Sequence, residues 1–279
     1  MKKVLIWVLA FVITAGSAVY QRITGPTYAV SGNIQLGGSV ISFTLETTHE
    51  TIGDYEINIE APDSGTSGYV QFKRFKTGDP WTNIPMERKE GSLTASLPQQ
   101  PSSGKLAYKV FLSHNGEEVS LTGEDEVVIR FKDVVPDIVL ILHIITIFAA
   151  MLLSTRTGIE ALNKDGNTRK LTLWTAGFMF AGGMILGPIV QKFAFGEWWT
   201  GFPFGFDLTD NKTLIAMIVW AIAVIAGRKG KQAKGWVLAA SIVTLVIFLI
   251  PHSLLGSELD YSQIENQVSQ TIAFFIPKF

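Results

Sequence analysis

Five long apolar runs interrupt the chain. They cover residues 4–20, 138–154, 171–190, 214–227 and 236–250. A helix needs about 20 apolar residues to cross a typical bilayer, with a range of about 17 to 25. The run at 171–190 meets this length outright, and the others reach it together with their flanking residues. The pattern predicts transmembrane helices at these positions, as in a multi-domain membrane protein.

Between the first two runs, apolar and polar residues alternate with a period of two. The alternating segments fall at 41–45, 55–59, 93–97, 106–112 and 127–131. Such alternation, with turn residues between the segments, is typical of half-buried strands. Asn115-Gly116 predicts a tight hairpin, because both residues tolerate positive φ. We expect residues 28–132 to be all-β, with about seven strands, which suits a two-sheet sandwich.

Aromatic and corner residues of this segment carry a resemblance to a known family. Trp81 and Tyr108 fall where packing aromatics are expected, and Leu97-Pro98 precedes the strand that holds Tyr108. On these features, residues 67–112 resemble a fibronectin type III or immunoglobulin-like module. The resemblance implies a sandwich and contacts with proteins or glycans. It implies no activity, because such sandwiches host unrelated functions.

Positive charge marks one side of the predicted membrane segments. Basic residues precede the first run and fill two of the short loops: Lys2, Lys3, Arg156, Lys164, Arg169, Lys170, Arg228, Lys229, Lys231 and Lys234. Excess Lys and Arg in short loops marks the cytoplasmic side. We therefore expect the N-terminus in the cytoplasm, and the β domain, loop 191–213 and the C-terminal tail outside. The expected location is the bacterial inner (cytoplasmic) membrane.

The first apolar run has two interpretations. Lys2-Lys3, an apolar stretch and then Ala15-Gly16-Ser17-Ala18 fit a cleaved signal peptide. The run continues through Tyr20, which favours an uncleaved anchor. The expected domains are an anchor or signal at 1–22, a β-sandwich at 23–134, four transmembrane helices at 135–252 and an extracytoplasmic amphipathic tail at 253–279.

Composition excludes several classes of protein. The chain has no cysteine, so disulfides, thiolate metal sites and thiol catalysis are excluded. The net charge is −1 and no basic stripe is present, so nucleic-acid binding has no support. The short cytoplasmic segments leave no room for a kinase, cyclase or ATPase domain.

His49 and His114 are expected to be surface histidines beside turns of the β domain.

Residues 193–213 form the most unusual loop, FAFGEWWTGFPFGFDLTDNKT. Its aromatics could form an interfacial belt, while the interspersed glycines favour a folded surface around Glu197, Trp198 and Trp199. Asp207 and Asp210 have a structural explanation near the start of the fourth span, with Thr209 or Asp210 as the helix cap. Pro188 is expected to kink or end the third span, and Gly183 and Gly187 to allow close helix packing.

Two histidines are candidate ligands near the outer face. His143 lies in the second span, where ionisable residues are costly and often functional. Its alternative is a neutral imidazole bonded to a backbone carbonyl or to Thr146. His252 follows the fifth span, and with Glu197, Trp198, Trp199 and Asp207 the pair could hold haem or a transition metal. Trp198-Trp199 also resembles the haem-handling segment of cytochrome c assembly proteins, which have a longer tryptophan pattern.

These observations leave three functional hypotheses. The first is a non-catalytic scaffold or accessory subunit, embedded in the lipid bilayer, whose sandwich binds an envelope protein or a second copy. The second is a haem- or metal-binding redox or assembly protein that uses His143 and His252. The third is a small transporter subunit. The sequence offers no nucleophile–base pair for catalysis.

Overall fold

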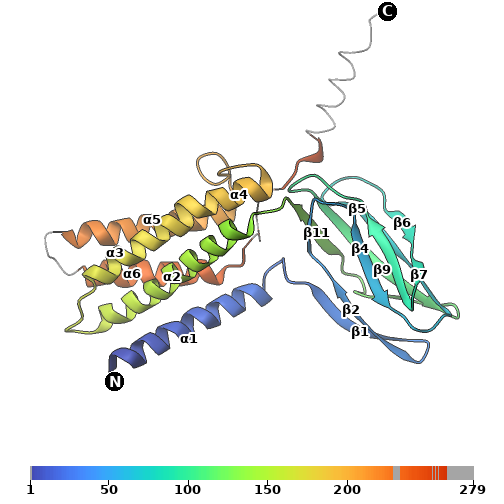
Figure 1. The fold of residues 1–279 in the computed structure, drawn as a ribbon, viewed down its shortest axis with the longest axis horizontal. Helices are drawn as coiled ribbons and strands as arrows, with labels where there is room; N and C mark the ends of the chain where they lie inside the picture. The colour runs from blue at the N-terminus through green and yellow to red at the C-terminus, as the bar shows by residue number, and fades with distance from the viewer. Residues whose placement is uncertain (1, 229–232, 253, 255, 257, 263–279) are drawn as a thin grey trace, which may run out of the picture. The chain divides into compact units, whose positions relative to one another are not determined.

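The computed structural model describes residues 2–228, 233–252, 254, 256 and 258–262 (Figure 1). The chain forms two compact units, which are described separately here. Residues 1–28 and 133–257 make up the first unit, which is helical. Residues 29–132 and 258–279 make up the second, which is built mainly of strands and is called the β domain below. The predicted amphipathic tail lies mostly outside the described residues.

The helical unit follows the five apolar runs. Its elements are α1 (Lys2–Ile23), α2 (Asp137–Leu162), α3 (Arg169–Met179), the π-helical η1 (Phe180–Leu186), α4 (Gly187–Phe195), α5 (Leu208–Ala226) and α6 (Lys234–Leu249). Among the described residues, four helical segments are long and apolar enough to cross a membrane: Lys3–Ile23, Asp137–Leu162, Arg169–Phe195 and Leu208–Ala226. The fifth, α6, is apolar but shorter.

Arg156 corrects the expected boundary of the first basic loop. It lies inside α2, is 6% exposed, and pairs with Glu160 at 2.7 Å. Its guanidinium also lies 5.4 Å from the centre of the Trp7 ring. Arg156 was predicted to lie in the loop because the apolar run ends at Ser154. The helix continues beyond this run to Leu162, and the i,i+4 pair of Arg156 and Glu160 supports the extension.

Small residues allow α2 and α6 to approach closely. Ser241 Oγ donates to the carbonyl of Ser154 at 2.9 Å. A Cβ added at Gly158 would collide with Ser241 Oγ and lie 2.6 Å from the Ser241 Cβ. The close approach therefore depends on the absence of a side chain at Gly158.

Gly158→Ala is expected to lower the stability of the helical unit by about 1–3 kcal/mol, because the new methyl group overpacks the α2–α6 contact. Gly177→Ala is the matched control, since a Cβ at Gly177 meets nothing within 4 Å. It should be neutral or slightly stabilising, as alanine favours helix over glycine. Thermal unfolding in detergent measures both, and equal shifts for the two variants would contradict the close packing.

The third span departs from a regular helix before Pro188. The helix does not end there, as the sequence analysis allowed, but continues to Phe195. Proline is tolerated because it occupies the first turn of α4. In the preceding π-helical segment, the Gly187 N–H bonds to the carbonyl of Gly182. π-Helical turns are often found at functional sites.

The predicted packing of glycines in this span is partly correct. A Cβ at Gly182 would lie 3.0 Å from Ile147 N in α2, and one at Gly183 would lie 2.5 Å from Thr213 Cγ2 in α5. These two glycines therefore face neighbouring helices closely. Gly187 is less tightly packed, because its nearest neighbour atoms lie at 3.5 Å and beyond.

The β domain contains eleven strands within its described residues. They are β1 (Val30–Leu36), β2 (Ser39–Leu45), β3 (Thr48–Glu50), β4 (Tyr55–Glu60), β5 (Thr66–Arg74), β6 (Thr82–Pro85), β7 (Glu87–Lys89), β8 (Ser92–Leu97), β9 (Lys105–His114), β10 (Glu117–Ser120) and β11 (Val127–Lys132). One sheet has the order β3-β11-β9-β5-β6, with β10 also paired to β9. A second has the order β4-β8-β7, and β1 pairs with β2. β3 runs parallel to β11, and the other pairs are antiparallel.

Strands from all three sheets contribute to one hydrophobic core, as the period of two predicts. The alternating side chains of β4, β8, β9 and β11 are buried. Tyr108 is fully buried and donates to the carbonyl of Glu46 at 2.8 Å. Asn115 and Gly116 have φ values of 49° and 86°, which confirms the predicted hairpin between β9 and β10.

Three aromatic or histidine residues differ from their predicted positions. Trp81 is only half-buried and lies under Lys73, with Nζ 4.7 Å from the ring centre, so it is not a core residue. His49 packs near Tyr55 and Phe131. The His114 side chain is 12% exposed and lies beside Asp63 and Thr66. The two histidines are therefore packed within the β domain and are not simple surface residues.

Candidate functional site

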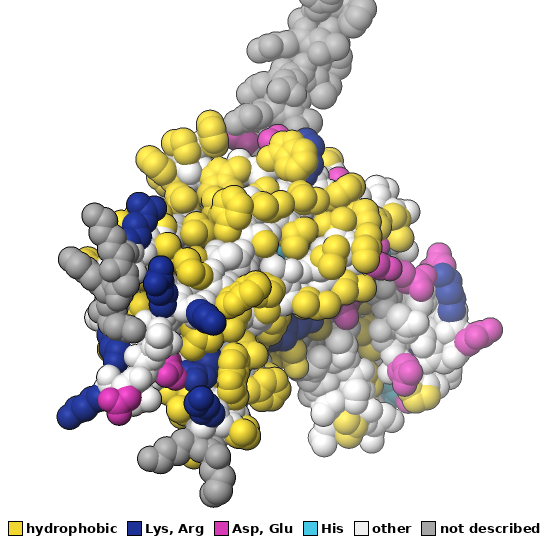
Figure 2. All heavy atoms as spheres, turned by 60° about the vertical axis from the view of Figure 1, so that its left-hand side comes forward, with side chains coloured by type: hydrophobic (Ala, Val, Ile, Leu, Met, Phe, Trp, Pro, Cys, Tyr) yellow, Lys and Arg dark blue, Asp and Glu magenta, His cyan; other side chains and the backbone are white. Residues whose placement is uncertain are grey.

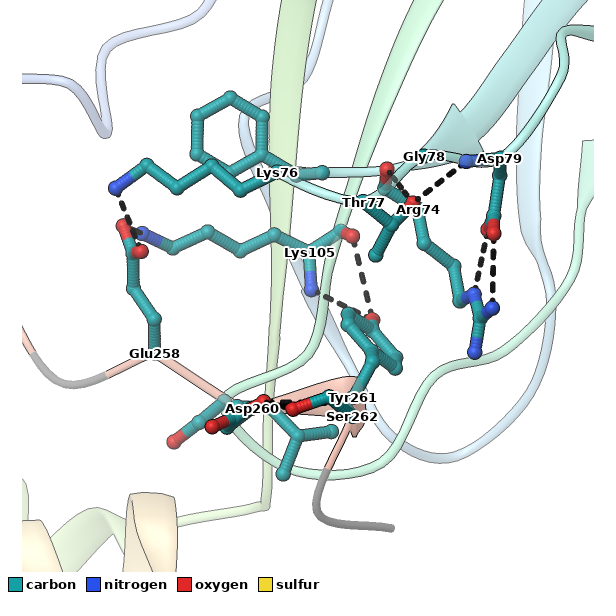
Figure 3. A pocket seen from close by; sticks show the side chains of 13 residues that line it. Arg74, Lys76, Thr77, Gly78, Asp79, Lys105, Glu258, Asp260, Tyr261 and Ser262 are labelled. Carbon is teal, nitrogen blue, oxygen red and sulfur yellow. Dashed lines mark hydrogen bonds and ion pairs between the residues drawn. The ribbon is translucent and has the colours of Figure 1, made fainter. Parts of the chain in front are cut away.

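The β domain has a pocket of about 520 Å³ where a C-terminal segment docks on the sheet (Figure 3). We call residues 258–262 the C-terminal strap. One wall is the turn that follows β5, and the floor includes the start of β9. The strap supplies the remaining wall, so the pocket joins residues that are far apart in the sequence.

Glu258 of the strap binds two lysines of the β domain. Its carboxylate accepts from Lys76 Nζ at 2.7 Å and from Lys105 Nζ at 2.7 Å. Figure 3 shows both ammonium groups converging on the same carboxylate. The Lys105 side chain is 14% exposed, whereas the Lys76 side chain is 62% exposed. Lys105 is therefore the enclosed partner, and Lys76 remains open to solvent.

Tyr261 fixes the other end of the strap. Its hydroxyl accepts from the backbone N–H of Lys105 at 3.1 Å and lies 3.0 Å from Gln100 Oε1. The Arg74 guanidinium stands 5.0 Å from the centre of the Tyr261 ring and forms a two-point ion pair with Asp79, at 2.6 and 2.9 Å. Both ends of the strap are thus held by named side chains.

Local charges shift the pKa values of the pocket residues. Burial opposes the charge of Glu258, but the hydrogen bonds and charges of Lys105 and Lys76 outweigh it and hold the pKa below its usual value. Burial lowers the pKa of Lys105, and Glu258 offsets only part of this effect. The hydrogen bond from Arg74 is the largest cause of the lowered pKa of Asp79.

Acidification is expected to weaken the docking of the strap. The pKa of Glu258 is lower in the docked state than in the undocked state. The ionised carboxylate therefore stabilises the docked strap above the ordinary pKa of 4.5, and this stabilisation is lost as the pH falls through the lowered pKa. At pH 7, Glu258→Gln should reduce hydrogen-exchange protection of the strap by about fivefold, a small effect because solvent screens these partly exposed pairs. As the pH falls below 4.5, after correction for intrinsic exchange, the difference between the variant and the parent should shrink. A difference that stays constant as the pH falls from 7 through this range would contradict the role of the Glu258 carboxylate.

In the helical unit, the loop between α4 and α5 is folded by acidic and amide side chains of α5. Asp207 is the N-cap of α5, accepting from Thr209 N at 2.8 Å, so the prediction of Thr209 or Asp210 as the cap is wrong. Asp210 is 7% exposed, and its Oδ2 accepts from Thr200 N at 2.6 Å and from Gly201 N at 3.0 Å. Asn211 Oδ1 accepts from Phe202 N at 2.7 Å.

This ordered loop exposes most of its aromatic side chains. Exposure is 56% for Trp198, 66% for Phe202, 82% for Phe204 and 92% for Phe206. Glu197 is also exposed, whereas Trp199 is partly buried and donates from Nε1 to the carbonyl of Phe202 at 3.0 Å. Of the predicted residues, Glu197 and Trp198 are therefore exposed, whereas Trp199 stabilises the loop.

His143 in α2 has a backbone partner in the π-helical segment. Its Nδ1 lies 3.0 Å from the carbonyl of Gly182. Since a carbonyl can only accept, Nδ1 carries the proton, and a neutral ring then has its lone pair on Nε2. This is the backbone bond that the structural interpretation of His143 expected. Thr146 is not its partner, because the Thr146 hydroxyl donates to the carbonyl of Leu142.

His252 lies near a buried lysine that caps α6. Lys212 of α5 is 5% exposed and donates from Nζ to the carbonyls of Ile250 and Pro251, at 2.8 and 3.2 Å. Cations favour the negative end of a helix, which explains this position. His252 keeps exposed surface, and burial by the neighbouring protein together with the charges of Lys212 and His143 lowers its pKa to about 4.

The predicted ligand residues do not form a metal centre of three or more groups. His143, Lys212 and Asp207 lie within electrostatic range of His252, because their charges act on its pKa. Within the part of the chain that the structure describes, however, no cluster of three or more His, Asp or Glu side chains could hold a metal ion. Lys212, Arg74, Lys76 and Lys105 could not be recognised as site residues from the sequence, because ordinary exposed lysines and arginines share their local pattern.

Comparison with protein-family models, with curated proteins and with solved structures finds no match for this chain.

Proposed function

We propose that the chain is a membrane-anchored, non-catalytic binding protein whose β domain recognises an envelope partner outside the cytoplasm. In this proposal, the apolar helices cross the membrane with the orientation that the basic loops predict. The β domain is an immunoglobulin-like sandwich that presents the pocket beside the C-terminal strap.

The strand order supports an immunoglobulin-like sandwich. Constant-type immunoglobulin domains place strands A, B, E and D on one sheet and C, F and G on the other. The neighbours β4-β8-β7 correspond to B-E-D, and β5-β9-β11 correspond to C-F-G. β6 then extends the second sheet at one edge, and the short β3 extends it at the other.

The packing of α1 supports an anchor that is retained in the folded protein. Thr14 Oγ1 donates to Thr155 Oγ1 of α2 at 3.3 Å. Gln21 Nε2 donates to the carbonyl of Ile250 at 3.0 Å, just beyond α6. A helix with such partners contributes to the helical unit, which a cleaved signal peptide would not do.

The observation that carries a binding function is the composition of the β-domain pocket. Its described side chains form ion pairs, Arg74 with Asp79 and the two lysines with Glu258. The Ser262 hydroxyl also donates to Asp260 Oδ1, two residues away, at 2.6 Å. Such a charged surface suits charge recognition. Lys76 is the most accessible cation of the pairs with Glu258, so a carboxylate of the partner would meet it first.

A photo-crosslinking amino acid at Thr77, inside the pocket, tests this function in cells. It should give one discrete adduct, and Lys76→Glu should reduce that adduct at least fivefold. Lys89→Glu is the matched control, because Lys89 is similarly exposed and ion-paired but lies outside the pocket. An adduct of twice the chain's mass would identify a second copy as the partner. Absence of an adduct, or equal loss with both substitutions, would overturn the proposal.

The second candidate function is binding of haem or a transition metal by His143 and His252. It is favoured by the carbonyl bond at His143 Nδ1, because metal-ligating histidines commonly donate their other ring N–H to such a group. Visible absorption and metal analysis of the purified protein test it. A bound chromophore or metal that is lost in His143→Ala and His252→Ala would support it. A colourless, metal-free protein with unchanged variants would exclude it.

A further inference from the structure

The helical unit has a second pocket, of about 210 Å³, between the ends of α3, α5 and α6. Apolar side chains form much of its wall, including Leu173, Val224 and Val237. Leu173 is also 53% exposed, so the wall continues onto the apolar outer surface of the helices. This volume is below the roughly 300–1,000 Å³ of typical sites for drug-sized ligands. The pocket therefore suits a small headgroup better than an enclosed cofactor.

Two arginines line the pocket and lack a carboxylate partner. Arg169 begins α3, Arg228 follows α5, and both are exposed. Among the described residues, no ion pair or side-chain hydrogen bond involves either guanidinium. Figure 2 shows Lys and Arg side chains gathered on the left of the view, beside an extensive apolar surface. Arg169 and Arg228 thus carry positive charge that no ion pair among the described residues neutralises.

Two helix N-termini at the pocket also favour a negatively charged ligand. Thr168 and Ala233, the N-cap residues of α3 and α6, both line it, and neither forms a side-chain cap. Helix N-termini attract anions through their free N–H groups and their dipole. Thr168 as a residue is 2% exposed and lines the pocket, and none of the hydrogen bonds among the described residues involves its hydroxyl. A hydroxyl at a cavity wall can donate to a ligand oxygen.

We propose that this pocket binds the phosphate group of an anionic phospholipid. Arg169 and Arg228 contact the phosphate at the mouth, Thr168 donates from within, and an acyl chain follows the exposed apolar surface beside Leu173. The proposal depends on the membrane placement proposed above, and not on the partner site of the β domain. It also accounts for arginines at the pocket, because guanidinium groups match phosphate geometry in two-point contacts.

Binding of defined lipids to the purified full-length protein tests the proposal. Phosphatidylglycerol should bind and raise the melting temperature more than phosphatidylcholine, whose choline is repelled by the arginines. Combining Arg169→Gln with Arg228→Gln should weaken phosphatidylglycerol binding roughly 30-fold, because each basic residue near an anionic surface contributes about 1 kcal/mol. Native mass spectrometry measures the lipid affinity directly.

A matched variant controls for net charge. Lys164→Gln with Lys170→Gln also removes two exposed positive charges near this end of the unit, but neither residue lines the pocket. It should retain at least a third of the parent's affinity. Equal loss in both double variants would show general charge attraction, and stabilisation by inorganic phosphate alone would show a free-anion site. Either result would overturn the lipid assignment. Neither result bears on the partner site of the β domain, which the crosslinking experiment at Thr77 tests independently.

Discussion

Replacing Tyr108 with alanine is expected to destabilise the β domain by about 3–5 kcal/mol, the largest effect we anticipate for one substitution. The Tyr108 ring is fully buried in β9 among side chains of the core. Removing it leaves a cavity that the surrounding strands can fill only in part. The loss also removes the hydrogen bond to the Glu46 carbonyl. Hydrogen exchange of β4, β8 and β9 measures the effect within the β domain.

Tyr108→Phe separates the two contributions. It keeps the ring and removes only the hydroxyl, so about 0.5–1.5 kcal/mol should be lost with the hydrogen bond to the Glu46 carbonyl. Domain-specific exchange is needed because a protein with two units need not unfold in one step. If Tyr108→Ala costs no more than Tyr108→Phe, the ring does not fill the core as described.

Asp210→Ala is expected to open the loop at 196–207. The substitution leaves the N–H groups of Thr200 and Gly201 without the carboxylate that they bind. Hydrogen bonds to charged groups contribute about 1.5–3 kcal/mol each, so a net loss of about 3 kcal/mol is expected. That corresponds to a roughly 100-fold larger opening equilibrium. Hydrogen exchange at the amides of Thr200 and Gly201 measures it.

Two further substitutions define the specificity of this effect. Asp207→Ala removes only the N-cap of α5 and should cost about 1 kcal/mol. Glu197→Gln changes an exposed residue of the same loop and should have little effect. If Asp210→Ala exchanges no faster than Glu197→Gln, the buried carboxylate does not hold the loop.

Periodic patterns predicted the local elements well. Alternation located β2, β4, β8, β9 and β11, and the apolar runs located the helices, because burial of one face leaves a repeating signal. The Asn115-Gly116 hairpin was predictable from backbone preference alone. The strands β3, β6, β7 and β10 were missed, since three or four residues are too few to show a period. The longer strands β1 and β5 were also missed, because glycine and polar residues interrupt their apolar alternation.

The sites depend on contacts that have no local pattern. Lys105 and Glu258 are 153 positions apart, so no spacing rule connects them. Asp210 was interpreted as a helix cap because its local context fits one, whereas its partners lie ten and nine positions earlier in the loop. The π-helical turn that binds His143 is likewise invisible to periodicity, because its glycines also fit ordinary helix packing.

The central proposal is that the β domain and the aromatic loop at 196–207 lie on the extracytoplasmic side of the membrane. The α2–α3 loop then lies on the cytoplasmic side. The chain has no cysteine, so single-cysteine variants report accessibility without background. Suitable exposed positions are Glu90 in the β domain, Glu197 in the aromatic loop and Asp165 between α2 and α3. In spheroplasts, a membrane-impermeant maleimide should label Glu90→Cys and Glu197→Cys, and Asp165→Cys only after lysis. Labelling of Asp165→Cys before lysis, or of the other two only after it, would contradict the account.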